Sequence, residues 1–461
     1  MRPTAARLFA DLSTVDHQPP SRRIMRRAVV LGGSMAGLMA ARVLSEHAEE
    51  VVVVGRDASE VGGQPRPGVP QGGQVHALLA GGQRQFERWF PGFHDEVLAA
   101  GATETPGDTI QRFTNGVRLP AMPRRSGARG LVATRPFLEA QVRRRTLALG
   151  NVRIAYGSAT GVVFQADKVV GAALDSGVVE RGDLVVDATG RSSRLTDWLA
   201  AAGWPAAPMR RMAVKVNYAT ALFRRDAAVG DTWAATSQDT PGHGRVPRIG
   251  SIMPVERDRW LMLISGYADD RPSRDLDDYR LRCRRDFPPM FADIAERGEL
   301  IGPVRTYHQA DSRRRDFHRL ARFPAGLVVA GDAVASVNPI YGQGMSSATL
   351  HASCLSAYLR DGPALEEPAW SYFDRVRVVV DAAWRVSTFA DLELPHVTGP
   401  YPRAYRLMKW SHDLLFRAAR TDSRTSARRG KVLSMVEHPS SLDRPGPLLR
   451  AARFSVFPRS T

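Results

Sequence analysis

The sequence has little cysteine, little lysine and no long apolar run. Only Cys283 and Cys354 are present, and neither belongs to a CxxC pair. This argues against a disulfide framework or a metal site and favours a reducing, cytoplasmic location. No run of about 20 apolar residues occurs, so we expect no transmembrane helix.

The charge is strongly positive, at +17, and arginine supplies most of it. Lysine accounts for four of the 64 basic residues: Lys168, Lys215, Lys409 and Lys431. Clustered basic side chains would indicate nucleic-acid binding, because they neutralise phosphates. The arginines are instead spread along the whole chain, so we expect no nucleic-acid partner. A general attraction to anionic surfaces or substrates remains compatible with this charge.

Residues 1–25 are polar, contain prolines and show no periodicity. They predict a disordered tail, and Met25 is an alternative start. The apolar run that follows carries regularly spaced glycines and lacks a small-residue cleavage site, which argues against a signal peptide.

From residue 26 the chain predicts an α/β fold with two bodies. A strand, a helix and a second strand open a Rossmann-like domain, for which we predict a first part at residues 26–210. Long loops at about 62–130 are expected to reach the substrate domain. Residues 211–320 alternate apolar and polar positions, which indicates an inserted antiparallel sheet. The chain then returns to the first domain at 321–364, and 365–461 predicts helices followed by a loose basic tail.

The first candidate motif is "LGGSMAG", which places Gly32, Ser34 and Gly37 at the three positions of GxGxxG. This spacing lets a diphosphate approach the backbone at a helix N-terminus, although a simple tight turn would have the same letters. An acid is expected at the end of the next strand to bind a ribose. Arg56 and Asp57 stand just after that position, so either Asp57 reaches back or Arg56 and the backbone hold the adenosine end.

Two further strands end in small residues. "LVVDATG" ends on Thr189 and Gly190, where a cofactor could pass closely, as in many ordinary strand–helix turns. "GLVVAGDAVASVNPIYGQGMSS" ends a buried strand on Asp332, a carboxylate that is costly unless it has hydrogen-bond donors. The ribityl chain of a flavin offers such donors. Gly342 and Gly344 leave backbone N–H groups uncovered at a helix start, where an anionic ring edge is favoured. The alternative is a glycine-rich helix entry with a capping acid.

Together these motifs resemble the class A flavin monooxygenases of the p-hydroxybenzoate hydroxylase type, over residues 26–355. The resemblance implies a Rossmann-like, GR2-type domain that binds FAD. It places Gly32, Ser34 and Gly37 at the FAD diphosphate, Arg135 of "TRPFLE" at the phosphate or ribose, and Asp332 at the ribityl chain. By the same resemblance, Pro339 lies against the flavin ring. The N–H groups from Gly342 to Met345 face that ring.

Two residues depart from the family pattern. One bears on how the flavin is reduced, and the other on a side-chain contact. Thr189 stands where the family has the aspartate of its DG motif, which is associated with FAD and NAD(P)H. The reductant is therefore NADPH or NADH, acting directly or through a separate flavin reductase. Ser346 stands where the family has asparagine.

A narrower resemblance rests on "RPGVPQGGQVHALLAGG", "NYATALFRR", "DATGRSSRLTDWL" and "NPIYGQGMS". These segments look like the FAD-dependent epoxidases of actinobacterial polyketide pathways, such as the monensin and lasalocid epoxidases. The likeness places Arg66 and His76 beside the flavin and the substrate entrance. His76 lies among apolar residues, so a structural histidine is an equal interpretation.

The resemblance implies that a flavin C4a-hydroperoxide formed from molecular oxygen is the oxidant, so no catalytic side chain is assigned, and His76 and Arg66 are the candidates for such a role. An alkene needs no general base, whereas a phenol hydroxylase would use one. The expected reaction is epoxidation of a linear polyketide or similar apolar metabolite, as in antibiotic biosynthesis. The alternatives are an aromatic hydroxylase and a reductase of prenyl alkenes. A non-enzymatic basic binding protein would not explain the ordered glycine motifs.

A flavin-dependent halogenase is a near alternative, but its WxWxIP motif is absent and the first lysine is Lys168. Candidate substrate-lining residues lie on the inserted sheet, although alternation places about half of them in ordinary core. They are Trp233, Met253, Trp260, Met262 and Ile264.

Overall fold

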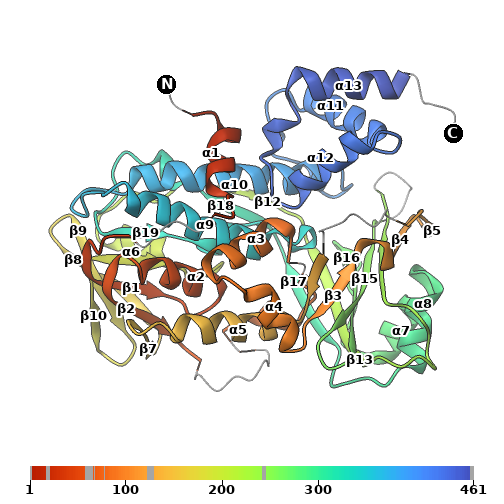
Figure 1. The fold of residues 1–461 in the computed structure, drawn as a ribbon, viewed down its shortest axis with the longest axis horizontal. Coiled ribbons are helices and arrows are strands. Elements are labelled where there is room, and N and C mark those ends of the chain that lie inside the picture. Colours follow the sequence, from red (N-terminus) through yellow and green to blue (C-terminus); the bar gives the residue numbers. More distant parts are fainter. Residues whose placement is uncertain are drawn as a thin grey trace.

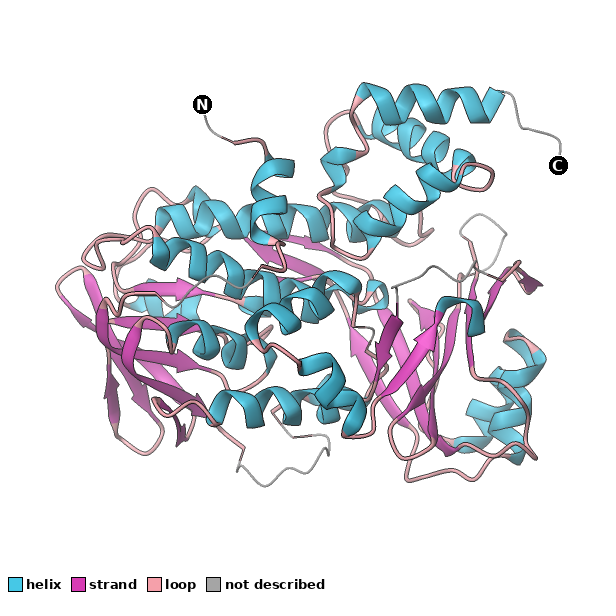
Figure 2. Ribbon diagram, in the orientation of Figure 1, coloured by secondary structure: helices cyan, strands magenta, loops and turns pink. Residues whose placement is uncertain are grey.

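The computed structural model describes residues 3–16, 21–57, 66, 68–76, 78–121, 129–240 and 246–456. An α/β body and a second body built on a sheet lie side by side, and helices from the C-terminal part of the chain lie above them (Figure 1, Figure 2). The predicted fold class is confirmed. None of the described helices combines the length and the apolar composition needed to cross a membrane.

A five-stranded parallel sheet forms the centre of the first body. Its strands follow the order β19 (Leu327–Val329), β11 (Leu184–Asp187), β1 (Met25–Leu31), β2 (Ala48–Gly55) and β7 (Val152–Tyr156). The valine-rich middles of β1, β2, β11 and β19 are buried on both faces, as parallel sheets between covering layers require. Since β1, β11 and β19 are neighbours, the three glycine-containing turns that follow them meet at one edge of the sheet.

Helices and a small sheet cover this central sheet. Helix α2 (Met35–Leu44) packs against α5 (Arg135–Leu147) and α9 (Gln343–Arg360), and α9 in turn contacts α3 (Ala80–Trp89) and α10 (Trp370–Asp391). A second sheet places β9 against β11. Its strands are β8 (Ala159–Gln165), β9 (Lys168–Leu174) and β10 (Val179–Arg181). Helices α4 (Phe93–Ala99) and α6 (Leu195–Ala201) complete this body.

The second body is a seven-stranded sheet with two helices on one face. Its strands follow the order β17 (Arg305–Gln309), β13 (Val216–Arg224), β16 (Arg259–Tyr267), β15 (Ile249–Val255), β14 (Ala234–Gln238), β4 (Ile110–Thr114) and β5 (Val117–Arg118). All neighbours are antiparallel except β14 and β4. The covering helices are α7 (Leu276–Asp286) and α8 (Pro289–Arg297) (Figure 1).

Short strands connect the two bodies. One small sheet holds β12 (Met209–Met212), β18 (Ser312–Arg315) and β20 (Ala335–Ser336), and another pairs β3 (Thr103–Pro106) with β6 (Arg129–Val132).

Three of the five predicted substrate-lining residues belong to a structural core. Trp260, Met262 and Ile264 are buried with Tyr279 and Phe291 of the covering helices. Alternation left open which of the five belong to ordinary core, and these three do, because α7 and α8 cover their face of the sheet. Met253 pairs with Leu261, which points away from α7 and α8, so Met253 lies on the uncovered face of the sheet. Trp233 precedes β14 and lies under the guanidinium of Arg225, 4.4 Å from its ring centre.

Trp260→Ala is therefore expected to act on stability. Its ring is 1% exposed and its indole N–H donates to the Thr232 carbonyl oxygen at 3.0 Å. Deletion of a buried tryptophan side chain costs about 3–5 kcal/mol of unfolding free energy. Denaturant unfolding measures this cost, with half-buried Met253→Ala as the comparison. A Trp260→Ala protein of unchanged stability that has lost substrate binding would contradict the core assignment.

Both ends of the chain are more ordered than the sequence indicates. The prediction of a disordered tail at residues 1–25 is wrong for its described part, because helix α1 (Ala5–Leu12) buries Phe9. The Phe9 ring lies 5.7 Å from that of His438, next to α10. The prediction of a loose basic tail at the end of the chain is also wrong for the part that the structure describes, which ends in a helix.

The C-terminal helices pack on one another (Figure 1). They are α11 (Tyr405–Ala418), α12 (Ser423–Leu433) and α13 (Pro445–Val456). Ala451 is buried against Leu414 and Ala418, and Arg450 binds Asp422 at 2.6 Å. The positive charges of this segment are thus attached to a packed helix.

Candidate functional site

The first turn of the α/β body is shaped by two glycines. A Cβ on Gly37 would overlap the carbonyl oxygen of Gly32, and a Cβ on Gly32 would overlap that of Ala188. Gly32 also has a left-handed φ of 110°, which L side chains rarely adopt. Helix α2 therefore starts directly against the ends of β1 and β11. This is the close approach that the GxGxxG spacing predicts.

Three arginines and a glutamate surround this turn. Arg143 donates to the Gly33 carbonyl oxygen at 2.7 Å, and Arg66 reaches the same oxygen at 3.4 Å. Glu139 accepts hydrogen bonds from Arg66 and, at 2.6 Å, from the Ser34 hydroxyl. Arg135 lies 3.4 Å from the Ser34 hydroxyl. We call these residues, from Gly32 to Ser34 with Arg66, Arg135, Glu139 and Arg143, the arginine cradle.

Two nitrogen atoms of the cradle are buried and have no hydrogen-bond acceptor among the residues that the structure describes. They are Nε of Arg135 and Nη1 of Arg143. Buried guanidinium N–H groups normally find a hydrogen-bond acceptor, so the cradle has capacity for a further anion. Sequence reasoning found Arg66 and Arg135 but missed Glu139 and Arg143. The available signal was the spacing of Arg135 and Glu139, which places them on one helix face.

A cavity of about 200 Å³ opens beside the cradle. Five predicted residues line it: Gly32, Ser34, Arg56, Arg66 and Thr189. Asp57 lines it too and binds Arg66 at 3.0 Å. The hydroxyl and the N–H of Thr189 both donate to Asp187, at 2.6 and 3.0 Å, so this pair fixes the turn after β11. Gly190 continues that turn with a φ of 83°.

Asp332 follows β19 on the short helix η4 (Gly331–Ala333), on the sheet edge that also holds the cradle. Burial raises the pKa of its carboxyl group, while the positive charges of Arg135 and Arg191 and a hydrogen bond from Ser336 act in the opposite direction. Gly344 lies alongside, because a Cβ there would be 4.0 Å from the Asp332 Oδ1 atom. Asp332 thus faces the first turn of α9.

The start of α9 and the buried His351 shape the backbone around Asp332. Gly342, with a left-handed φ of 67°, directly precedes α9, and the Met345 side chain packs into the core. The Gly331 N–H donates to Nδ1 of buried His351 at 2.9 Å. Burial lowers the pKa of His351 to about 4, so this acceptor is neutral at physiological pH.

The turn that contains Pro339 is held by a buried polar network. Asp391 of α10 accepts from Asn338 at 2.7 Å and from the Tyr341 hydroxyl at 3.1 Å. Asn338 also lies 3.4 Å from the Tyr267 hydroxyl of the inserted sheet. The short helix η5 (Pro339–Tyr341) is thereby fixed from both bodies.

Asp391 is expected to make stability fall as pH rises. Burial raises its pKa to about 7, despite hydrogen bonds from Asn338, Tyr341 and Ser387 that lower it. Between the ordinary value of 3.8 and about 7 the folded state binds more protons than the unfolded state, so raising the pH favours unfolding. Asp391→Asn removes this pH dependence. The unfolding free energy of the variant relative to that of the parent should therefore rise by up to about 4 kcal/mol as the pH increases from 3.8 to about 7. Chemical unfolding at several pH values measures it, and a constant difference would contradict the assignment.

His76 supports Arg135. Its Nε2 atom accepts from Arg135 Nη1 at 3.2 Å, and its Nδ1 atom donates to the Gln74 carbonyl oxygen at 2.9 Å. Burial, and then the charge of Arg135, lower the pKa of His76 to about 3. A neutral imidazole with both nitrogens engaged favours the structural interpretation over a catalytic one.

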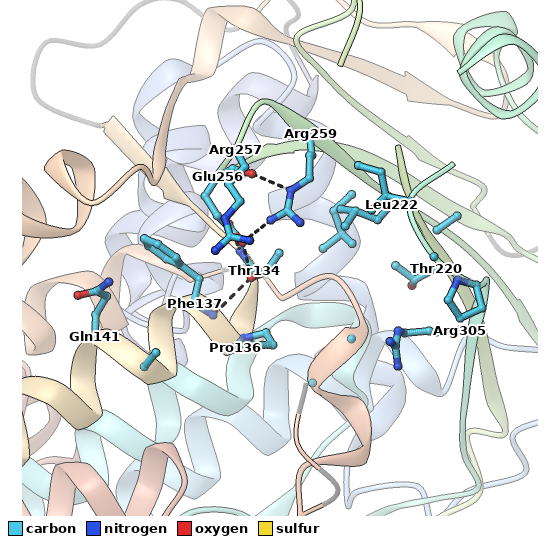
Figure 3. A pocket seen from close by; sticks show the side chains of 18 residues that line it. Thr134, Pro136, Phe137, Gln141, Thr220, Leu222, Glu256, Arg257, Arg259 and Arg305 are labelled. Atoms are coloured by element: carbon cyan, nitrogen blue, oxygen red, sulfur yellow. Dashed lines mark hydrogen bonds and ion pairs between the residues drawn. The ribbon is translucent and has the colours of Figure 1, made fainter. Parts of the chain in front are cut away.

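A larger cavity of about 430 Å³ lies between the two bodies (Figure 3). The start of α5, the short helix η1 (Pro70–Gly73) and the uncovered face of the inserted sheet enclose it. Its apolar wall includes Pro136, Phe137, Leu222, Leu261 and Ile301. None of the five predicted lining residues belongs to it. Among the described residues, no group of three or more His, Cys, Asp or Glu side chains could hold a metal ion.

Known structures share this fold. The flavin-dependent brominase Bmp2 aligns with a TM-score of 0.64 and 16% identity over 94% of this chain and 99% of its own. 2-Methyl-3-hydroxypyridine-5-carboxylic acid oxygenase aligns with a TM-score of 0.58 and 20% identity, over 80% and 90%. PqsL of P. aeruginosa, in complex with 2-aminobenzoylacetate, aligns with a TM-score of 0.58 and 20% identity over 80% of this chain and 97% of its own. The chain therefore shares the fold of these three proteins.

A full-length relative shows the family. Protein Rv3254 of Mycobacterium tuberculosis is 33% identical over 413 residues, which span 86% of each chain. The chain belongs to the same family as that protein. No family model matches the chain.

Proposed function

We propose that the protein is an FAD-dependent monooxygenase that transfers one atom of molecular oxygen to a small, largely apolar molecule. The observation that carries the proposal is the joint position of the arginine cradle and Asp332. Both lie at the same edge of the parallel sheet, after β1 and β19, the two strands that flank β11. The activities named for the oxygenase and the brominase that share the fold support this assignment.

The residues present fit FAD. Arg135 Nε and Arg143 Nη1 are buried without a hydrogen-bond acceptor in the described part of the chain, and a diphosphate would supply one. Asp332, whose pKa is raised by burial, offers a carboxylate to the hydroxyl donors of a ribityl chain. At the diphosphate and adenosine end we place Gly32, Ser34, Gly37, Arg56, Arg66, Arg135, Arg143, Thr189 and Gly190. At the ribityl chain and ring we place Asp332, Pro339, Gly342, Gly344 and Met345.

Bound FAD, once reduced, supplies the activation of oxygen, which protein side chains cannot perform. The chain's own residues orient the partners and exclude water. His76 holds Arg135 toward the cradle, and the network of Asn338, Tyr341 and Asp391 fixes the turn that contains Pro339. Preformed positions of this kind lower the barrier because no reorganisation is needed during the reaction.

The 430 Å³ cavity favours an alkene over a phenol as the substrate. Among the described residues Glu256 is the only carboxylate that lines it, and hydrogen bonds from Thr134 and Arg259 occupy this carboxylate. The described part of the lining thus offers no free carboxylate to deprotonate a phenol. Epoxidation of a linear polyketide or similar apolar metabolite is the finer proposal, and aromatic hydroxylation is its alternative. Reduction of a prenyl alkene is a third candidate.

The test is product mass after aerobic incubation of the FAD-loaded protein with a polyene ester, NADPH and a helper flavin reductase. Gain of oxygen-18 from ¹⁸O₂ supports the monooxygenase, and an added bromide arm separates halogenation, which would give a brominated product. A substrate that gains two hydrogens identifies a reductase. Consumption of reduced flavin without any product from alkenes or phenols contradicts the proposal.

The source of electrons is NADPH or NADH, either directly or through a separate flavin reductase. Anaerobic mixing of the FAD-loaded protein with each nucleotide distinguishes these routes. Loss of flavin absorbance without the helper reductase shows direct reduction.

A further inference from the structure

The 430 Å³ cavity carries an excess of positive charge. Three arginines and one glutamate line it: Arg257, Arg259, Arg305 and Glu256. Arg259 donates to a Glu256 carboxylate oxygen at 2.8 Å, and Thr134 donates to the same carboxylate through its N–H and hydroxyl at 2.9 and 2.7 Å. Glu256 and Arg259 therefore neutralise each other within the wall. The charges of Arg257 and Arg305 remain.

Neither remaining arginine has an ion-pair partner among the described residues, and both are exposed to the solvent that fills the cavity. Arg305 rises from β17, and its aliphatic stem lies against Gly73, where a Cβ would be 2.6 Å from Arg305 Cδ. Arg257 enters from the turn between β15 and β16, so two separate elements supply the charge (Figure 3).

Arg257 occupies a backbone position that costs free energy. Arg257 and Asp258 have left-handed φ values of 61° and 53°. Glycine, asparagine and aspartate tolerate this region, but arginine does not. Asp258 binds Arg225 at 2.7 Å, outside the cavity, whereas Arg257 lines the cavity. A strained residue without a structural partner at the wall of a cavity indicates a role in binding.

We propose that this cavity binds an amphipathic organic anion. Its apolar body lies against Phe137, Leu222 and Leu261, and Arg257 and Arg305 bind its carboxylate or phosphate. We assign the ligand as the anionic end of the substrate, and this assignment rests on the proposed function. The same chemistry is offered by the phosphates of a nicotinamide dinucleotide, which the test separates.

The test compares dodecanoate with dodecanol, a neutral molecule of equal chain length, by titration calorimetry on the FAD-loaded full-length protein. The variants are Arg257→Asn and Arg305→Gln. Each is expected to weaken dodecanoate binding about 5-fold and to leave dodecanol binding unchanged, since one rim charge contributes about 1 kcal/mol. Arg257→Asn should keep or raise the melting temperature, because asparagine tolerates the left-handed turn. Failure to fold therefore does not explain its effect.

Arg181→Asn on exposed β10 gives the same change of net charge far from the cavity and should leave dodecanoate binding unchanged. If Arg257→Asn and Arg305→Gln weaken NADPH binding but leave dodecanoate binding unchanged, the substrate assignment is overturned in favour of the dinucleotide. If dodecanoate and dodecanol each bind the variants as tightly as they bind the parent, the proposal of an anion site is overturned. Arginine-dependent dodecanoate binding by a protein that oxidises nothing would uphold the anion site and contradict the proposed function.

Discussion

Asp332→Ala is expected to lower FAD affinity about 100-fold without unfolding the protein. Charge-assisted hydrogen bonds contribute about 1.5–3 kcal/mol each, and a carboxylate facing a ribityl chain makes more than one of them. The apoprotein should be as stable as the parent at pH 7, or more so. Burial raises the pKa of this carboxyl group, so the surroundings disfavour its charged form when no ligand donates to it. The residue thus serves binding at the expense of stability.

Flavin fluorescence quenching measures the affinity, and thermal unfolding of the flavin-free proteins measures the stability. Asp332→Asn keeps a carbonyl acceptor without the charge, so its affinity for FAD should lie between those of the parent and of Asp332→Ala. Ser336→Ala, next to the carboxylate, should change FAD affinity only slightly. Unchanged FAD affinity in Asp332→Ala would remove the observation on which the flavin assignment rests.

Gly37→Ala is expected to cost about 3 kcal/mol or more of unfolding free energy and to abolish FAD binding. The added Cβ would overlap the Gly32 carbonyl oxygen, so helix α2 must move away from the end of β1. Overpacking of a close contact costs about 1–3 kcal/mol, and backbone overlap lies at the upper end of that range. The displacement also moves Ser34 and the cradle around it.

The matched control is Gly430→Ala, which also replaces a glycine inside a helix, α12. A Cβ there has no atom within 4 Å, so this variant should gain about 1 kcal/mol from helix propensity. Denaturant unfolding of the two variants should therefore move in opposite directions. A Gly37→Ala protein with parental stability and FAD affinity would contradict the close packing of α2.

The strand ends of the α/β body could be predicted because their signals are local. Gly32 needs a left-handed backbone, and Asp332 ends a strand that is buried on both faces; each feature shows within a few residues. The order of strands follows from the fold rules for such units. Helix α1 could not be found in this way, since its stability comes from burial of Phe9 near His438, at the other end of the chain.

The face of the inserted sheet could not be predicted either. Alternation separates Met253 from Met262 but does not say which of them meets α7 and α8. That choice depends on packing with helices that follow later in the chain. Glu139 and Arg143 were missed for a similar reason, because their partners Ser34 and Gly33 are more than 100 residues away along the chain.

The strand order also governs how the molecule assembles during synthesis. β11 lies between β1 and β19 in the parallel sheet, but β19 is translated only after the strands of the inserted sheet. Strands β14, β15 and β16 form consecutive antiparallel pairs that can fold early, whereas β19 must close a long loop. A growing chain therefore carries a finished inserted sheet while the edge beside β11 is still open. Asp332 joins the cradle in one of the last steps of folding.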